Sequence, residues 1–146
     1  MKKKTIDIIV PCYNEEDVLN MFYTELSKVI DTIHDYDCRC IFVDDGSRDR
    51  TWEKIVSLTE KEEFISALKL SANSGHQNAL LGGLITLKDY ADAVISIDAD
   101  LQDDINAIDG MLDRYYEGCD IVYGVRKKRD TDTFFKRFIQ FTFISA

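Results

Sequence analysis

Proline is almost missing from this sequence, which has one proline, Pro11, and seven glycines among its 146 residues. No internal repeat, low-complexity segment or linker-like stretch interrupts the chain, so we expect a single folded domain. The sequence also lacks any run of about 18 apolar residues, which excludes a transmembrane helix within it. The lysines at positions 2–4 lead directly into a strand pattern, so we expect no targeting segment.

Cysteine pairs of the Cys-x-x-Cys type are absent as well, and no secretory leader precedes the cysteines. We therefore expect reduced, mostly buried thiols in a cytosolic domain. The four cysteines are Cys12, Cys38, Cys40 and Cys119.

Positive charge is outnumbered, with 18 lysines and arginines against 27 aspartates and glutamates. The formal net charge is −9, which argues against general nucleic-acid binding, and we expect no nucleic-acid partner. Apolar residues make up 45% of the chain and charged residues 31%, a composition typical of a soluble globular protein. Residues 126–137 are the exception, because six basic and two acidic side chains give this stretch a net charge of +4. Such a local reversal of charge calls for a functional reason.

Short β-branched runs alternate with segments of helical periodicity along the chain. The pattern predicts an α/β domain with a Rossmann-like, mostly parallel sheet that is covered by helices on both faces. The first strand is expected to stop before Pro11, which cannot donate to the ladder. The expected strands are 5–10, 38–43, 65–70, 93–97 and 120–125, and the expected helices are 18–33, 51–58, 79–87, 106–116 and a last one from 133.

Polar and acidic loops follow three of these strands, at residues 13–15, 44–47 and 98–103. In sheets of this kind, ligands bind outside the carboxyl ends of the strands. Asp98 and Asp100 are two residues apart at a strand end, where their side chains can converge, and Gln102 adds a neutral oxygen. Oxygen ligands suit Mg²⁺ or Mn²⁺. The alternative is a solvated acidic loop without a ligand.

Taken in order, these loops resemble those of family 2 glycosyltransferases with the GT-A fold. The loop at 98–103 resembles the metal motif of one subgroup, the polyprenyl-phosphate sugar transferases, and two further segments are similar to bactoprenol glucosyltransferases and dolichyl-phosphate mannose synthases of that subgroup. The resemblance covers residues 6–137. The segments that carry it are Val-Pro-Cys-Tyr-Asn-Glu at 10–15, Val-Asp-Asp-Gly-Ser at 43–47, Asn-x-Gly-His-Gln-x-Ala at 73–79, Asp-Ala-Asp-Leu-Gln-Asp at 98–103 and Val-Tyr-Gly-Val-Arg at 122–126.

The resemblance implies a nucleotide-sugar site along the three loops. Tyr13 would lie against the base, Glu15 would bind the ribose hydroxyls, and Asp45 would accept an N–H on the base edge. Alternatively, Tyr13 and Glu15 belong to an ordinary exposed loop. The other residues implied in this site are Pro11, Val43, Asp98 and Ala99.

The resemblance also assigns the metal and the phosphates. Asp98, Asp100 and Gln102 would hold Mg²⁺ or Mn²⁺, and Asp100 and Arg126 are the implied catalytic residues. Arg126 would neutralise phosphate through its guanidinium fork, the alternative being an ordinary surface arginine. Two more basic residues, Lys136 and Arg137, would assist at the acceptor phosphate.

The implied reaction moves a hexose from a nucleotide sugar, with UDP-glucose favoured over a guanosine donor, to a polyprenyl phosphate with inversion. A lipid phosphate is largely dianionic at neutral pH and needs positioning rather than a base. His76 is therefore expected to have a structural role. Whether the protein is a homo-oligomer stays open. The nearest alternative is a soluble family 2 transferase acting on a polysaccharide or protein.

A receiver-like signalling domain is a further alternative, but its acidic pair would follow the first strand rather than the second. A dinucleotide-binding domain is excluded because no Gly-x-Gly-x-x-Gly follows a strand. A bare interaction module without chemistry stays open.

The last segment is expected to differ from the rest. Residues 1–132 would form the nucleotide-sugar domain. Residues 133–146, with five apolar side chains on one helical face, would begin an amphipathic helix at the membrane surface. The alternative is a helix packed on the sheet. The resemblance implies a longer enzyme on the cytoplasmic face of the cell membrane, of which this chain would be a soluble part. Prolines common after the metal segment in the family are replaced here by Asp104, Ile105 and Asn106.

Overall fold

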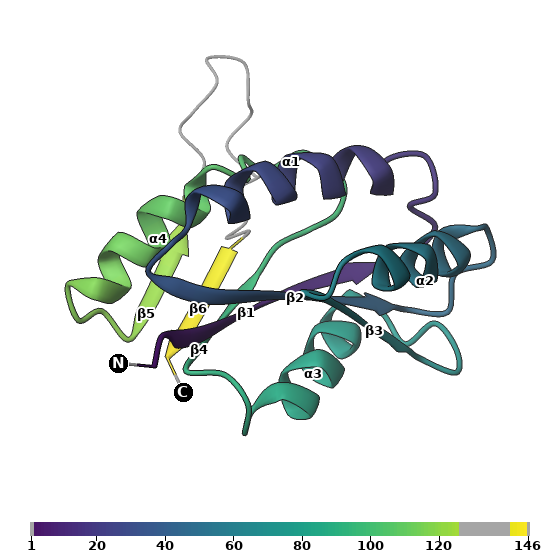
Figure 1. The fold of residues 1–146 in the computed structure, drawn as a ribbon. Helices are drawn as coiled ribbons and strands as arrows, with labels where there is room; N and C mark the ends of the chain where they lie inside the picture. The colour runs from purple at the N-terminus through teal and green to yellow at the C-terminus, as the bar shows by residue number, and fades with distance from the viewer. Residues whose placement is uncertain (1, 126–140, 146) are drawn as a thin grey trace, which may run out of the picture.

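The computed structural model describes residues 2–125 and 141–145, and Figure 1 shows their arrangement. Six strands form one sheet in the order β3-β2-β1-β4-β6-β5. The strands are β1 (Lys4–Cys12), β2 (Tyr36–Asp44), β3 (Ile65–Lys69), β4 (Ala93–Ser96), β5 (Ile121–Gly124) and β6 (Phe141–Ser145). The helices are α1 (Leu19–Thr32), α2 (Thr51–Lys61), α3 (His76–Leu87) and α4 (Ala107–Tyr116).

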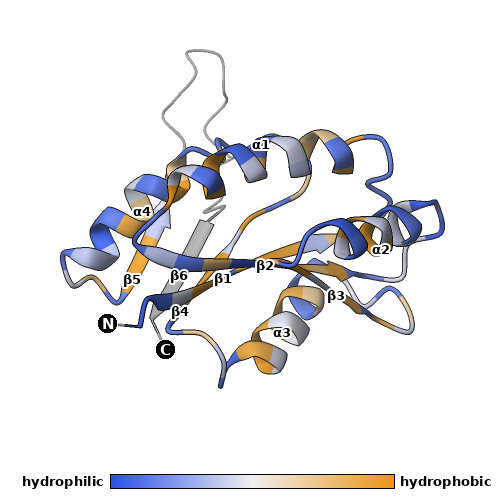
Figure 2. Ribbon diagram, viewed as in Figure 1, coloured by the Kyte–Doolittle hydropathy of each residue, from blue (hydrophilic) through white to orange (hydrophobic). Residues whose placement is uncertain are grey.

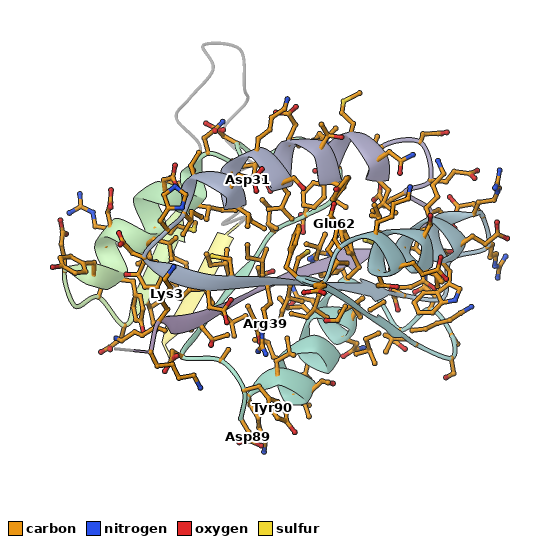
Figure 3. All side chains as sticks on the ribbon, in the orientation of Figure 1. Lys3, Asp31, Arg39, Glu62, Asp89 and Tyr90 are labelled. Atoms are coloured by element: carbon orange, nitrogen blue, oxygen red, sulfur yellow. The ribbon has the colours of Figure 1, made fainter. Side chains whose placement is uncertain are left out.

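The sheet is covered on both faces, as the sequence predicts. Side chains of a strand alternate between the two faces, so Ile8 and Phe42 join the core beneath α1, α2 and α4, whereas Ile9 and Val43 pack against α3. Figures 1 and 2 show α1 and α2 above the sheet and α3 below it. In Figure 3, side chains fill the layer between α1 and the strands.

The strand and helix pattern of residues 2–125 is confirmed, with shifts of a few residues at the ends. One expectation was wrong: β1 does not stop before Pro11 but continues to Cys12. The carbonyl of Ile9 accepts the N–H of Ile97. The backbone polar groups of Ile9, and those of Pro11 two residues further on, therefore point toward β4. Because β4 pairs with β1 only as far as Ser96, opposite Ile9, the missing N–H of Pro11 breaks no ladder bond.

The end of the chain differs from its prediction. Residues 141–145 form β6, which pairs antiparallel with both β4 and β5, so a helix over these residues was wrong. Phe141 to Ser145 are aromatic, β-branched or small residues, a composition that suits a strand when neighbouring strands offer open edges. The part of the expected helix from Thr133 to Gln140 lies outside the described residues. Within the described ranges, no helix combines the length and apolar character needed to cross a membrane.

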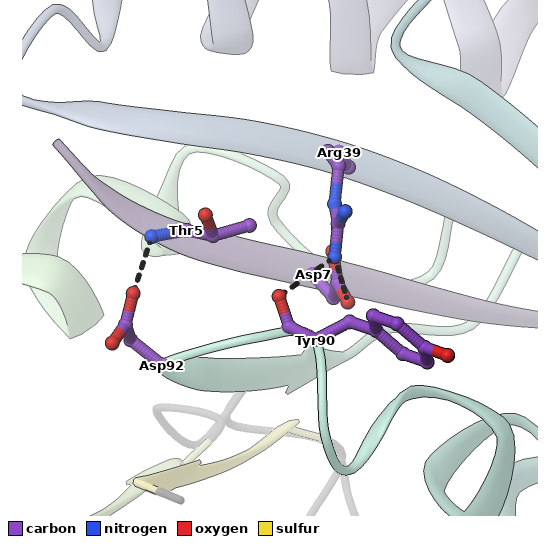
Figure 4. Close-up of polar contacts among 5 residues, drawn as sticks. All are labelled: Thr5, Asp7, Arg39, Tyr90 and Asp92. Carbon is purple, nitrogen blue, oxygen red and sulfur yellow. Dashed lines mark hydrogen bonds and ion pairs between the residues drawn. The ribbon is translucent and has the colours of Figure 1, made fainter. Parts of the chain in front are cut away.

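An ion pair between a buried carboxylate and a half-buried arginine joins the first two strands on the α3 side, as Figure 4 shows. The Asp7 carboxylate is fully buried and accepts two hydrogen bonds from Arg39, at 2.7 and 2.8 Å. Arg39 also donates to the Tyr90 carbonyl at 3.1 Å, in the loop between α3 and β4. Nearby, the backbone N–H of Thr5 donates to the Asp92 carboxylate at 2.8 Å. These contacts fix the loop that leads into β4.

The four thiols are free, as the sequence predicts, and only Cys119 is exposed. Burial raises the pKa of Cys38 to about 11, and burial raises the pKa of Cys12 well above its ordinary value. A thiolate is the reactive form. We therefore expect one thiol of the native protein to react rapidly with a chromogenic disulfide reagent at pH 8, and all four after unfolding. A second rapid native thiol would contradict this burial pattern.

Candidate functional site

A cleft of about 230 Å³ lies at the carboxyl end of the sheet, where the loops after β1, β2 and β4 meet the start of α3. The position is the one expected for a ligand site in a parallel sheet. Acidic side chains dominate the polar part of its wall. The residues that line it are Pro11, Cys12, Tyr13, Glu15, Asp45, Asn73, Gly75, His76, Ala79, Asp98, Ala99 and Asp100.

Reciprocal hydrogen bonds hold the loop after β1 against the loop after β2. Asn14 has a φ of +53°, a conformation that asparagine tolerates better than most residues. Its N–H donates to the Ser47 hydroxyl at 3.0 Å, and its side-chain oxygen accepts the N–H of Arg48 at 2.9 Å. The next residue, Glu15, donates its N–H to the Thr51 hydroxyl at 2.8 Å. Tyr13 and Glu15 are thereby presented to the cleft by a braced turn.

Asp45 connects the loop after β2 to α3. It is 3% exposed, and its two carboxylate oxygens accept the N–H groups of Ser74 at 2.7 Å and Gly75 at 3.0 Å. The neighbouring Gly46 has a φ of +70°, and a Cβ at this position would lie 2.5 Å from the backbone nitrogen of Asn73. Only glycine allows this close approach of the two loops. The start of α3 is therefore fixed by the Asp45 side chain.

The loop after β4 turns sharply at its acidic pair. Leu101 has a φ of +60°, and the Asp100 carboxylate accepts the N–H of Gln102 at 3.0 Å. His76, the first residue of α3, places its Nε2 3.3 Å from an Asp98 oxygen. This contact brings the beginning of α3 and the end of β4 together across the cleft.

The electrostatics of the cleft favour a bound cation. Burial raises the pKa of Glu15 above its ordinary value, and the charges of Asp100, Asp49 and Asp98 raise it further. Burial also raises the pKa of Asp98, His76 lowers it, and the charge of Asp100 raises it. Among the described residues that line the cleft, His76 is the only basic one. Gathered carboxylates of this kind attract a divalent ion.

Two carboxylates fit a magnesium or manganese ion that takes its other ligands from phosphate and water. No group of three or more His, Cys, Asp or Glu residues among those described could enclose a metal by itself. The donor set at Asp98 and Asp100 thus suits an ion that arrives with an anionic ligand rather than a closed structural site.

Most of the site residues predicted from the sequence come together in this cleft. Two do not line it: Val43 is fully buried against α3, and Gln102 is exposed beside Asp100. Arg126, Lys136 and Arg137 lie outside the described residues. The predicted residues that do line it are Pro11, Tyr13, Glu15, Asp45, Asp98, Ala99 and Asp100.

Several lining residues were not in the predicted site. Asn73, Gly75, His76 and Ala79 belong to the segment that resembles polyprenyl-phosphate sugar transferases, and that segment was the available signal. Cys12 lies between the predicted residues Pro11 and Tyr13, in the segment at 10–15 that carries the resemblance.

Sheet order, helix placement and the position of the cleft define the class: this is the GT-A fold of glycosyltransferases. The mannosyltransferase PcManGT from Pyrobaculum calidifontis, solved with GDP-Man and Mn²⁺, superposes with a TM-score of 0.73 at 15% identity. That superposition covers 99% of this chain and 45% of PcManGT. TarS from S. aureus, solved with UDP, superposes with a TM-score of 0.68 at 20% identity, covering 88% of this chain and 37% of TarS.

The chain belongs to glycosyl transferase family 2, whose family model matches residues 7–145. It is 50% identical to the glycosyltransferase YkoT of Bacillus subtilis (strain 168) over 137 residues, covering 90% of this chain and 41% of YkoT. It is 35% identical to the bactoprenol glucosyl transferase of Shigella phage SfV over 134 residues, covering 90% of this chain and 42% of that protein. The chain thus spans about two fifths of these relatives.

Proposed function

We propose that this chain binds the donor for a transferase that moves a hexose from a nucleoside diphosphate sugar to a polyprenyl phosphate. The observation that supports the proposal is the cleft itself. Tyr13, Glu15 and Asp45 line it together with Asp98 and Asp100. Tyr13, Glu15 and Asp45 suit the nucleoside of a donor. Asp98 and Asp100 suit its metal-bound diphosphate.

Each residue then has a chemical task. The Tyr13 ring would lie on the base, and the Glu15 carboxylate would accept the ribose hydroxyls. Asp98 and Asp100 would hold Mg²⁺ or Mn²⁺, with Gln102 beside them. When bound, the ion neutralises charge on the departing diphosphate. The hydrogen bonds made by Asn14 and Asp45 keep these groups in place before the donor binds.

The acceptor is proposed from the relatives named as bactoprenol glucosyl transferases. An oxygen of the lipid phosphate would attack the anomeric carbon as the bond from that carbon to the diphosphate breaks, which inverts the configuration. Arg126 would neutralise phosphate charge during this step, with Lys136 and Arg137 nearby in the basic stretch. The full-length enzyme would work at the cytoplasmic face of a membrane, where such a lipid presents its head group.

Donor binding can be tested directly on this chain. We expect UDP with Mn²⁺ to raise the melting temperature more than UDP or Mn²⁺ alone, because ligand and ion complete one site. UDP should also stabilise more than GDP, as the resemblance to glucosyltransferases implies. A panel of UDP, GDP, UDP-glucose and GDP-mannose, with and without Mn²⁺, measures both effects.

Two results would count against the proposal in different ways. A larger shift with GDP would overturn the uridine preference and leave a guanosine donor. The absence of any shift with all four nucleotides would remove the nucleotide-sugar site.

A further inference from the structure

His76 contacts one of the two acidic residues proposed to hold the ion, and it does so from the other side of the cleft. It is the first residue of α3, and its Nε2 lies 3.3 Å from Oδ1 of Asp98 in the loop after β4. Among the described residues, His76 is the only polar partner of the Asp98 side chain. The carboxylate of Asp100, by contrast, accepts the N–H of Gln102 within its own loop. Asp98 is therefore held from α3 and Asp100 from its own turn.

The backbone on either side of His76 is itself fixed. The two residues before it, Ser74 and Gly75, donate their N–H groups to the buried carboxylate of Asp45. Gly75 has a φ of +92°, a conformation that favours glycine, and its carbonyl accepts the N–H of Ala79 at 3.0 Å in the first turn of α3. His76 thus lies on a short backbone segment that is tied to the loop after β2.

A carboxylate that binds an ion gains affinity when it is ordered beforehand. The Asp98 side chain is 29% exposed, and without a partner it could adopt several rotamers. Ordering it only when the ion binds would cost conformational entropy. Partners that orient ligating carboxylates typically contribute about 10- to 100-fold to metal affinity. A neutral imidazole can act in this way, because its Nε2–H donates without carrying a charge.

We infer that His76 is a positioning residue that holds the Asp98 carboxylate ready for the divalent ion bound together with the donor diphosphate. This inference rests on the proposed function. It gives His76 more than the structural role expected from the sequence. Because Asp45 fixes the backbone just before His76, the first residues of α3 connect the part of the cleft proposed for the nucleoside with the part proposed for the diphosphate.

Three variants of His76 separate this role from a structural one. His76→Leu removes the ring nitrogens, and calorimetric titration should show UDP binding in the presence of Mn²⁺ weakened about 10-fold, with metal-free UDP binding unchanged. His76→Gln can place an amide N–H near the former Nε2 position, so it should recover the affinity to within about 3-fold of the parent. The amide of His76→Asn reaches only the position of Nδ1, so this variant should bind as weakly as His76→Leu.

Gln77→Leu is the matched control. Gln77 is the next residue of α3, is exposed and does not line the cleft, so the same kind of change there should leave binding of UDP and Mn²⁺ as in the parent. The side chain of His76 is 51% exposed, so the ligand-free variants should all melt within about 2 °C of the parent protein.

Each other outcome counts against the inference in its own way. Unchanged affinity in His76→Leu would overturn it while leaving the proposed function intact, and higher affinity would show that His76 competes with the ion for Asp98. If His76→Gln and His76→Asn bind alike, the position of the nitrogen does not matter and His76 serves only the start of α3. If UDP binding by the parent does not depend on Mn²⁺, the proposed metal site fails first and takes the inference with it.

Discussion

Asp100→Asn is expected to abolish metal-dependent binding of a nucleoside diphosphate, and Asp98→Asn to have a similar effect. Each change replaces a charged oxygen ligand with a neutral amide in a site that offers the ion two carboxylates. We expect affinity for UDP in the presence of Mn²⁺ to fall on the order of 100-fold, while the weak metal-free affinity stays the same. Calorimetric titration of UDP with and without Mn²⁺ measures both quantities.

Asp104→Asn provides the control for this experiment. Asp104 is exposed in the same loop, does not line the cleft, and accepts the N–H of Asn106 at 3.0 Å, a contact that asparagine can retain. The control has the same loss of charge and should bind UDP and Mn²⁺ as the parent does. Unchanged affinity in both Asp98→Asn and Asp100→Asn would remove the metal site from the proposed mechanism.

The layout of this site could be predicted from the sequence because two simple rules apply to it. Alternating strand and helix periodicity predicts a parallel sheet, and the carboxyl ends of parallel strands meet at one edge. Residues as distant in sequence as Tyr13, Asp45 and Asp98 are therefore expected at one cleft, and all three line it. The resemblance to family 2 glycosyltransferases supplied the roles, which physical pattern alone does not assign.

The contacts that hold the site could not be predicted in the same way. The bonds from Ser74 and Gly75 to Asp45 join loops 29 and 30 residues apart, and no periodicity encodes them. Pro11 was misread because a local rule ends a strand at proline, whereas its place opposite the end of β4 depends on a neighbouring strand. Residues 141–145 were misread because the helical pattern before them was extended across a boundary that only strand pairing defines.

Arg39→Met, a change outside the cleft, is expected to cause a large loss of stability. The Asp7 carboxylate is 0% exposed and would lose both of its 2.7 and 2.8 Å hydrogen bonds. Breaking a buried pair by removing one partner costs roughly 3–5 kcal/mol. Arg39 is 37% exposed, so water can reach part of the pair, and we expect a loss near the lower end, about 3 kcal/mol. Urea denaturation measures the free energy of unfolding. Arg48→Met, at an exposed arginine, is the control and should change it little.

The double variant Asp7→Asn with Arg39→Met tests the physical reason for that loss. If the cost comes from the uncompensated charge of Asp7, removing that charge should recover more than half of the stability lost in Arg39→Met. If the cost comes instead from the bond between Arg39 and the Tyr90 carbonyl, at 3.1 Å, the double variant should be no more stable than Arg39→Met alone. The first result would show that Arg39 stabilises the fold mainly by compensating the buried charge of Asp7. The second would show that Arg39 acts mainly by fixing the loop that leads into β4 and the acidic turn beyond it.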